Sequence, residues 1–151
     1  MLIVGGLSLV AEAPLLFPAI GASAFLVFNA PTSPLASPKH VIVGHLIGAT
    51  LGCVCAWLFG VAAHEPWLAT GEPWRAALSA SLALALTAPA MTLTRSAHPP
   101  AGATTLIFAT GLMGGAVDFV AVLASAVALT AFGLLAHRVS KDVYPRWSPN
   151  V

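Results

Sequence analysis

The sequence predicts an all-α integral membrane protein, organised as one transmembrane domain over residues 1–151. Only 7% of the 151 residues are charged and the mean hydropathy is +0.92, whereas an ordinary soluble domain has roughly 25% charged residues. Apolar stretches long enough to cross a bilayer recur along the chain. A short segment interrupted by proline and glycine lies in the middle of each half. These observations predict two inverted repeats of three helical segments each.

The first repeat covers about residues 1–63 and the second about residues 74–139. The six expected segments are 1–13, 19–29, 40–63, 74–94, 100–112 and 116–139. The first is short, because a spanning helix takes about 20 residues. Each central segment is a short helix that begins after proline, which the first helical turn tolerates. Because each half has an odd number of segments, the second half should run opposite to the first.

The charges favour a topology in which both termini are cytoplasmic. Lys and Arg collect on the cytoplasmic side of membrane proteins. Under six segments this side would carry Lys39, Arg95, Arg138, Lys141 and Arg146. Glu65 and Glu72 would lie on the other side, with Arg75 as the cation there.

The two central segments share a motif. Residues 97–106 read AHPPAGATTL and residues 17–26 read FPAIGASAFL, so proline precedes Gly-Ala and a hydroxyl in both. A helix N-terminus with unpaired amides favours an anion. The candidate substrate-binding residues are Gly21, Ala22, Ser23, Gly102, Ala103, Thr104 and Thr105. The alternative is that these small residues serve close helix packing alone.

Four ionisable residues are candidates for roles around this site. His45 lies within a span and His98 precedes the two prolines, and ionisable residues inside a membrane are candidates for function. We expect the two histidines to take part in gating or proton transfer. The alternative for His45 is a structural hydrogen bond to a neighbouring helix, and the alternative for His98 is to cap the loop. Lys39 and Arg95 are candidates for the charge of an inner mouth; the alternative for Arg95, which we favour, is a topology signal.

The remaining polar residues favour structural roles. His40, His64 and His137 lie near expected interfaces and should be solvated. Cys53 and Cys55 diverge on a helix and should be buried thiols, and Asp118 should cap the last helix. No metal-ligand spacing and no nucleophile–base pattern appears, so we expect no metal, no cofactor and no enzymatic activity. A net charge of +1 argues against a nucleic-acid partner.

Two blocks of residues resemble the HPP family of integral membrane proteins. His98-Pro99-Pro100-Ala101-Gly102-Ala103 matches the motif that names the family. Residues 21–24, residues 31–39 and Gly44-His45 are similar to its first block. The chain departs from the family pattern at Lys39, His40 and Arg95, which stand where Arg, Asn and a small polar residue are usual. The resemblance implies a bacterial cytoplasmic-membrane protein with relatives that carry nitrite in chloroplast envelopes.

The leading hypothesis is a transporter or channel for a small inorganic anion, with nitrite as the expected substrate and the lipid bilayer as its surroundings. One alternative is a channel for a small neutral solute such as ammonia or carbon dioxide. Another is a membrane module that binds partner proteins without transport. Six short segments enclose little volume within one chain, which is compatible with a homo-oligomer, but no residue specifies one.

Overall fold

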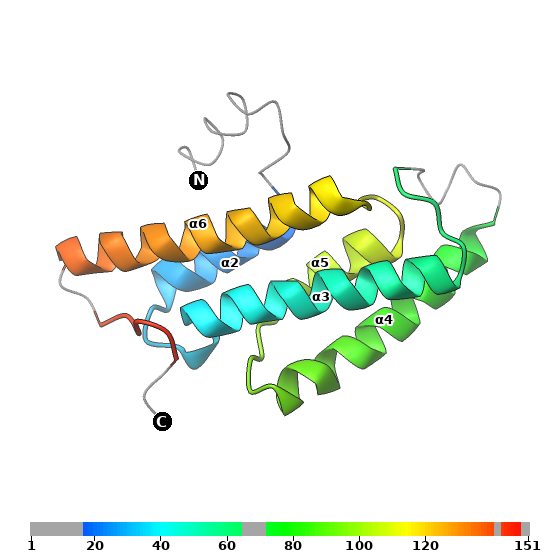
Figure 1. Cartoon of the computed structure of the whole chain (residues 1–151). Coiled ribbons are helices and arrows are strands. Elements are labelled where there is room, and N and C mark those ends of the chain that lie inside the picture. Colours follow the sequence, from blue (N-terminus) through cyan, green and yellow to red (C-terminus); the bar gives the residue numbers. More distant parts are fainter. Residues whose placement is uncertain (1–16, 65–71, 141–142, 149–151) are drawn as a thin grey trace.

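The computed structural model describes residues 17–64, 72–140 and 143–148, and this part of the chain is helical without strands. Figure 1 shows the helices packed into one bundle, with the green helix inclined to the others. Their bounds are α2 Pro18–Asn29, α3 Pro38–Leu58, α4 Pro73–Leu93, α5 Ala101–Ala109 and α6 Ala116–Ser140, with a 3-10 turn η1 at Pro34–Ala36. The all-α prediction is therefore confirmed.

Five of the six expected segments form helices close to their predicted bounds. The first expected segment, residues 1–13, lies outside the described residues. The inverted repeat therefore stays a prediction, because its first half is described only in part. Residues 30–37 join α2 to α3 and contain η1, which begins at Pro34, a position that proline tolerates. We call this segment the 30–37 loop.

Three helices are long and apolar enough to cross a membrane. These are α3 with 21 residues, α4 with 21 and α6 with 25, at mean hydropathies of 2.0, 1.6 and 2.3. Their large apolar side chains point outward, as at Leu78 on α4 and Phe132 on α6. The buried positions are mostly small residues such as Ala49, Ala83 and Ala126. Lipid is as apolar as leucine, so small residues that let helices approach are what a membrane interior needs.

The two short helices run in opposite directions along the molecule (Figure 1). Helix α2 begins near the middle of the long dimension and runs toward the end where α3 begins. Helix α5 begins near the same middle region and runs toward the end where α3 finishes. Their early residues therefore lie at depth within the bundle.

A stripe of three glycines on α3 lets α5 approach its backbone. A Cβ at Gly44 would lie 2.7 Å from the Cβ of His98, and one at Gly48 would lie 2.6 Å from the carbonyl oxygen of Ala101. A Cβ at Gly52 would lie 2.7 Å from the Cβ of Phe108 and 2.7 Å from the carbonyl oxygen of Thr105. Such distances leave no room for a side chain. The glycine stripe therefore sets how closely the HPP motif and α5 lie against α3.

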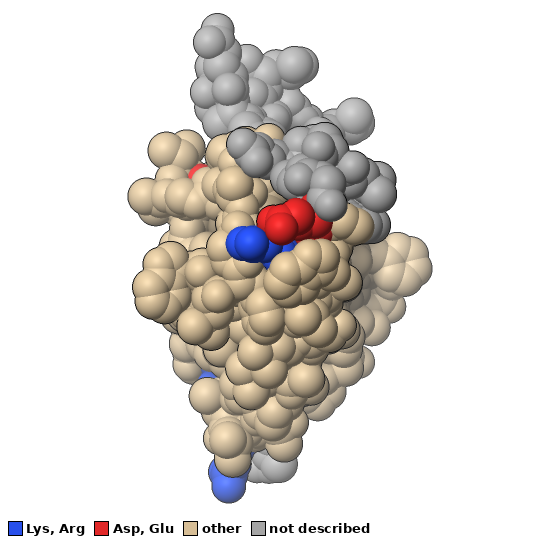
Figure 2. Space-filling model, turned by 90° about the vertical axis from the view of Figure 1, so that its right-hand side faces the viewer, with Lys and Arg blue, Asp and Glu red and all other residues tan. Residues whose placement is uncertain are grey.

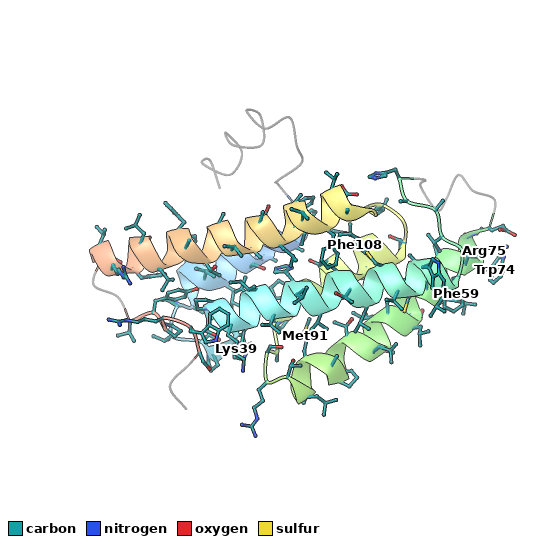
Figure 3. All side chains as sticks on the ribbon, viewed as in Figure 1. Lys39, Phe59, Trp74, Arg75, Met91 and Phe108 are labelled. Atoms are coloured by element: carbon teal, nitrogen blue, oxygen red, sulfur yellow. The ribbon has the colours of Figure 1, made fainter. Side chains whose placement is uncertain are left out.

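The two ends of the bundle differ in charge. Lys39 lies at one end, and Trp74 and Arg75 lie at the other (Figure 3). Figure 2 views the second end and shows acidic and basic side chains beside each other. There Arg75 pairs with Glu72 at 2.7 Å, and its guanidinium lies over the ring of Trp74. Lys39 therefore lies at the end of the bundle remote from Arg75.

The residues after α6 fold back onto the end where α3 begins. The backbone amide of Lys39 donates to the carbonyl of Trp147 at 2.9 Å, and the Tyr144 hydroxyl donates to the carbonyl of Ala36 at 2.9 Å. Burial raises the pKa of Tyr144 to about 12, so the hydroxyl keeps its proton at neutral pH. The ring of His137 stacks on Tyr144.

Two of the three histidines expected in solvent are buried instead. His40 bonds the Ser37 hydroxyl at 2.7 Å, and His137 bonds the carbonyl of Val27 at 3.1 Å. The prediction was wrong because the 30–37 loop and the chain after α6 cover this end of the bundle. His64 is exposed as expected and pairs with Asp118 at 3.2 Å.

We predict that Gly48→Ala lowers the free energy of unfolding by about 1–3 kcal/mol, because overpacking a tight contact costs that much. The matched control is Gly102→Ala, whose Cβ would meet only a Leu84 methyl, at 3.5 Å, among the described residues. It should be neutral or gain about 0.5–1 kcal/mol from helix propensity. Thermal unfolding in detergent measures both, and equal stability of the two variants would contradict the assigned contact.

Candidate functional site

Four buried polar side chains meet where the two short helices begin. The Ser23 hydroxyl oxygen lies 2.9 Å from Nε2 of His45 and 2.8 Å from Nε2 of His98. Nδ1 of His45 lies 2.7 Å from the hydroxyl oxygen of Thr104. The imidazole centroids are 5.2 Å apart. We call Ser23, His45, His98 and Thr104 the histidine–hydroxyl cluster.

Each member of the cluster comes from a different part of the chain. Ser23 is on α2, His45 on α3 and Thr104 on α5, and His98 precedes the two prolines that lead into α5. None of the four side chains is more than 2% exposed. His45 lies about 10 Å from the start of a helix about 30 Å long, so the cluster sits well inside the bundle. The fold thus joins the two copies of the motif through polar side chains.

The 30–37 loop also reaches the cluster. Nδ1 of His98 lies 2.9 Å from the carbonyl oxygen of Leu35 on η1. Sequence reasoning missed this contact, because a backbone acceptor leaves no trace in residue identity. The prolines on both sides of Leu35 were its only signal, since they fix a loop that presents carbonyls without helical partners.

The hydrogen-bond directions in the neutral cluster follow from the groups present. A carbonyl only accepts, so His98 carries its hydrogen on Nδ1 and donates to Leu35. Nε2 of His98 is then an acceptor for the hydroxyl hydrogen of Ser23, for which the carbonyl of Ala19 at 2.9 Å competes; the remaining directions are those with this hydrogen on the His98 side. With that hydrogen used, His45 donates from Nε2 to the Ser23 oxygen and accepts at Nδ1 from Thr104. The result is one directed chain of donors from Thr104 through His45, Ser23 and His98 to Leu35.

The other candidate substrate-binding residues lie around the cluster without joining it. Gly21, Gly102 and Ala103 are half-buried and Ala22 is exposed. Thr105 is buried, but its hydroxyl faces α4 and lies 3.2 Å from that of Thr87. Thr105 therefore links α5 to α4.

The first amides of α5 are paired, contrary to expectation. The amides of Ala101, Gly102 and Ala103 donate to the carbonyls of residues 98, 99 and 100 at 3.0, 2.9 and 3.1 Å. The turn at the two prolines supplies these acceptors, which the motif alone did not indicate. The donors nearest the start of α5 that could turn to a ligand are therefore the cluster's side chains.

Lys39 and Arg95 do not touch the cluster. Lys39 is the second residue of α3 and lies half-buried at its beginning. Arg95 is exposed just after α4 and has a positive φ of 50°. The beginning of α3 and the end of α4 lie toward the same end of the bundle, the one toward which α2 runs (Figure 1).

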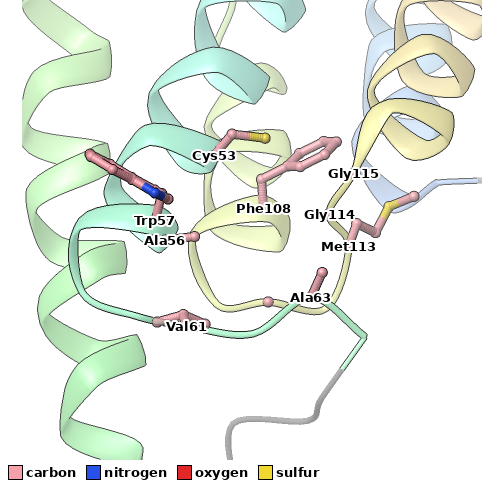
Figure 4. Close-up of a pocket in the computed structure, with 10 residues that line it drawn as sticks. Cys53, Ala56, Trp57, Val61, Ala63, Phe108, Met113, Gly114 and Gly115 are labelled. Atoms are coloured by element: carbon pink, nitrogen blue, oxygen red, sulfur yellow. The ribbon is translucent and has the colours of Figure 1, made fainter.

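A separate apolar pocket of about 190 Å³ opens at the opposite end. Figure 4 shows Cys53, Trp57 and Phe108 on its wall beside the glycine-rich turn before α6. Cys53 and Cys55 are free thiols; Cys55 is buried as expected, whereas Cys53 is half-buried. Asp118 accepts the amide of Gly114 at 2.8 Å, which confirms its role at the start of α6.

We predict that ¹⁵N NMR of histidine-labelled protein at neutral pH shows His98 with hydrogen on Nδ1 and His45 with hydrogen on Nε2. The two rings should differ because the Leu35 carbonyl orients one and the Thr104 hydroxyl the other. His45→Gln and His98→Gln variants assign the signals. The same tautomer at both rings would contradict the directed chain.

Comparison with known proteins identifies the family. A family model described as the transmembrane region of HPP matches residues 1–145. Two transmembrane proteins of Dictyostelium discoideum are similar to this chain. One is 37% identical over 98 residues, which cover 64% of this chain and 28% of the relative. The other is 32% identical over 142 residues, which cover 89% of this chain and 46% of the relative. The chain thus spans less than half the length of these curated relatives. No solved structure matches it. The match confirms the family that the His-Pro-Pro motif indicated: the chain belongs to the HPP family of transmembrane proteins.

Proposed function

We propose that this membrane protein carries a small inorganic anion, with nitrite as the leading substrate, and that the anion binds at the histidine–hydroxyl cluster. The single observation behind the proposal is that Ser23, His45, His98 and Thr104 are fully buried yet hydrogen-bonded to one another between two short helices. Polar groups at membrane depth are costly and mark substrate pathways.

The chemistry of the cluster suits a small anion. Its hydroxyls and imidazole N–H groups are donors that an anion's oxygens can accept. The dipoles of α2 and α5 both have their positive ends toward this region, as their directions in Figure 1 indicate.

The basic end of the bundle would face the cytoplasm under this proposal. Lys39, Arg95 and Arg138 lie there, and short cytoplasmic loops carry an excess of Lys and Arg. Both termini would then be cytoplasmic, in the inner membrane of a bacterium as the family resemblance implies. Anions in the cytoplasm would meet these cations before reaching the cluster.

A channel for a small neutral solute is the second candidate. It is favoured by one observation: none of the cluster's side chains is a fixed charge, because none is Asp, Glu, Lys or Arg. A neutral solute such as ammonia would exchange hydrogen bonds with the two imidazoles. It would cross without competing with nitrite.

We expect purified protein in liposomes to take up nitrite in a saturable manner, and Thr104→Val to reduce this uptake at least about tenfold. Valine keeps the shape of threonine and removes the hydroxyl that bonds His45. The control is Thr130→Val on α6, because its buried hydroxyl bonds only carbonyls of its own helix in the described structure. That variant should keep the uptake of the unmodified protein.

Absence of nitrite uptake above protein-free liposomes, from protein shown to be folded, would overturn the proposal. Ammonia flux that nitrite does not inhibit would instead favour the neutral-solute channel. Equal losses in Thr104→Val and Thr130→Val would show that the cluster has no special role.

A further inference from the structure

We infer that the histidine–hydroxyl cluster binds one proton together with each anion, so that transport moves one proton per anion and no net charge. This inference rests on the proposed function and adds that proton transport is coupled to anion transport. It is carried by the hydrogen-bond pattern of the cluster and by the charges of the helices around it.

One added proton completes the hydrogen bonds of the cluster. The Ser23 hydroxyl also lies 2.9 Å from the carbonyl of Ala19, which cannot receive the hydroxyl hydrogen while that hydrogen points to His98. A proton on Nε2 of His98 makes this ring a donor at both nitrogens, to Leu35 and to Ser23. The Ser23 hydroxyl then donates to Ala19 and accepts from both His45 and His98. All five contacts are satisfied in this state.

A second proton is disfavoured in the same cluster. It would make both His45 and His98 imidazolium ions with ring centroids 5.2 Å apart. Like charges this close in a region of low dielectric repel strongly. The geometry therefore accommodates one proton rather than two.

No acidic side chain balances this proton within the described residues. Helices α2 and α5 carry no titratable side chain, and α4 carries Arg75 at the end remote from Lys39. On α3, His40 bonds Ser37 and Lys39 adds a further cation. The carboxylate of α6 is that of Asp118, at the beginning of the helix. It accepts the amide of Gly114 and pairs with His64.

The other titratable groups near this end do not supply a negative charge either. His137 and Arg138 lie in the last turn of α6, Arg95 follows α4, and Tyr144 keeps its proton at neutral pH. A proton on the cluster would thus be a buried charge without a partner, which is costly. A bound anion removes that cost, and by linkage each ligand strengthens the binding of the other by the same factor.

The test is nitrite distribution across liposomes at a fixed membrane potential, with a pH-sensitive dye inside. Electrogenic passage of nitrite alone changes the equilibrium nitrite ratio about tenfold for each 59 mV of potential. We expect no change with potential and one proton entering per nitrite. Measurements run above neutral pH, and protein-free liposomes correct for nitrous acid that crosses the bilayer unaided.

Two variants locate the proton. His98→Gln should lower proton-coupled uptake at least about tenfold, since transfer groups contribute that much or more. His137→Gln is the matched control, a buried histidine bonded to a carbonyl outside the cluster, and it should keep one proton per nitrite. Circular dichroism and gel filtration confirm that both variants fold.

The outcomes separate the inference from the proposed function. Nitrite flux that follows the potential without protons would overturn the coupling and leave nitrite transport standing. Nitrite flux with one proton in His98→Gln would overturn the assignment to the cluster. No flux from folded protein would overturn the proposed function and the inference with it.

Discussion

The hydrogen bonds between Ser23 and the two histidines are the interaction on which the rest of the structure depends. A polar group inside a membrane must find partners within the protein, because lipid offers none. Ser23, His45 and His98 come from distant parts of the chain, and each satisfies the others. Loss of the Ser23 oxygen would leave two ring nitrogens unpaired, and such groups cost about 1–3 kcal/mol each. The cluster therefore fixes where the two short helices meet.

This meeting requires backbones that approach closely. Gly44, Gly48 and Gly52 bring α3 against the turn before α5 and against α5 itself. Ala101 is fully buried at that contact. Large apolar side chains then remain for the lipid-facing surface, as at Leu78. Packing of small residues and burial of polar groups are thus two aspects of one arrangement, in which close helices leave little space around the imidazoles.

Periodicity and composition predicted the helices well, since long apolar runs bounded by proline have few other solutions in a membrane. The repeated motif also placed Ser23 and Thr104 in one site with His98. Three features escaped prediction. The carbonyl of Leu35 is a backbone acceptor, the paired amides of α5 depend on turn geometry, and His137 is covered by the chain after α6. The first and third depend on tertiary contacts, and the second on the local turn at the two prolines, none of which can be read from residue identity.

The most direct test of the central claim is nitrite titration of histidine-labelled protein followed by ¹⁵N NMR. If the cluster is the substrate site, the signals of His45 and His98 should shift together and saturably, while the signal of His137 stays in place. Sulfate, which is larger, should not displace nitrite from the site. Nitrite that moves none of the ring signals, or moves all five histidines alike, would contradict the account.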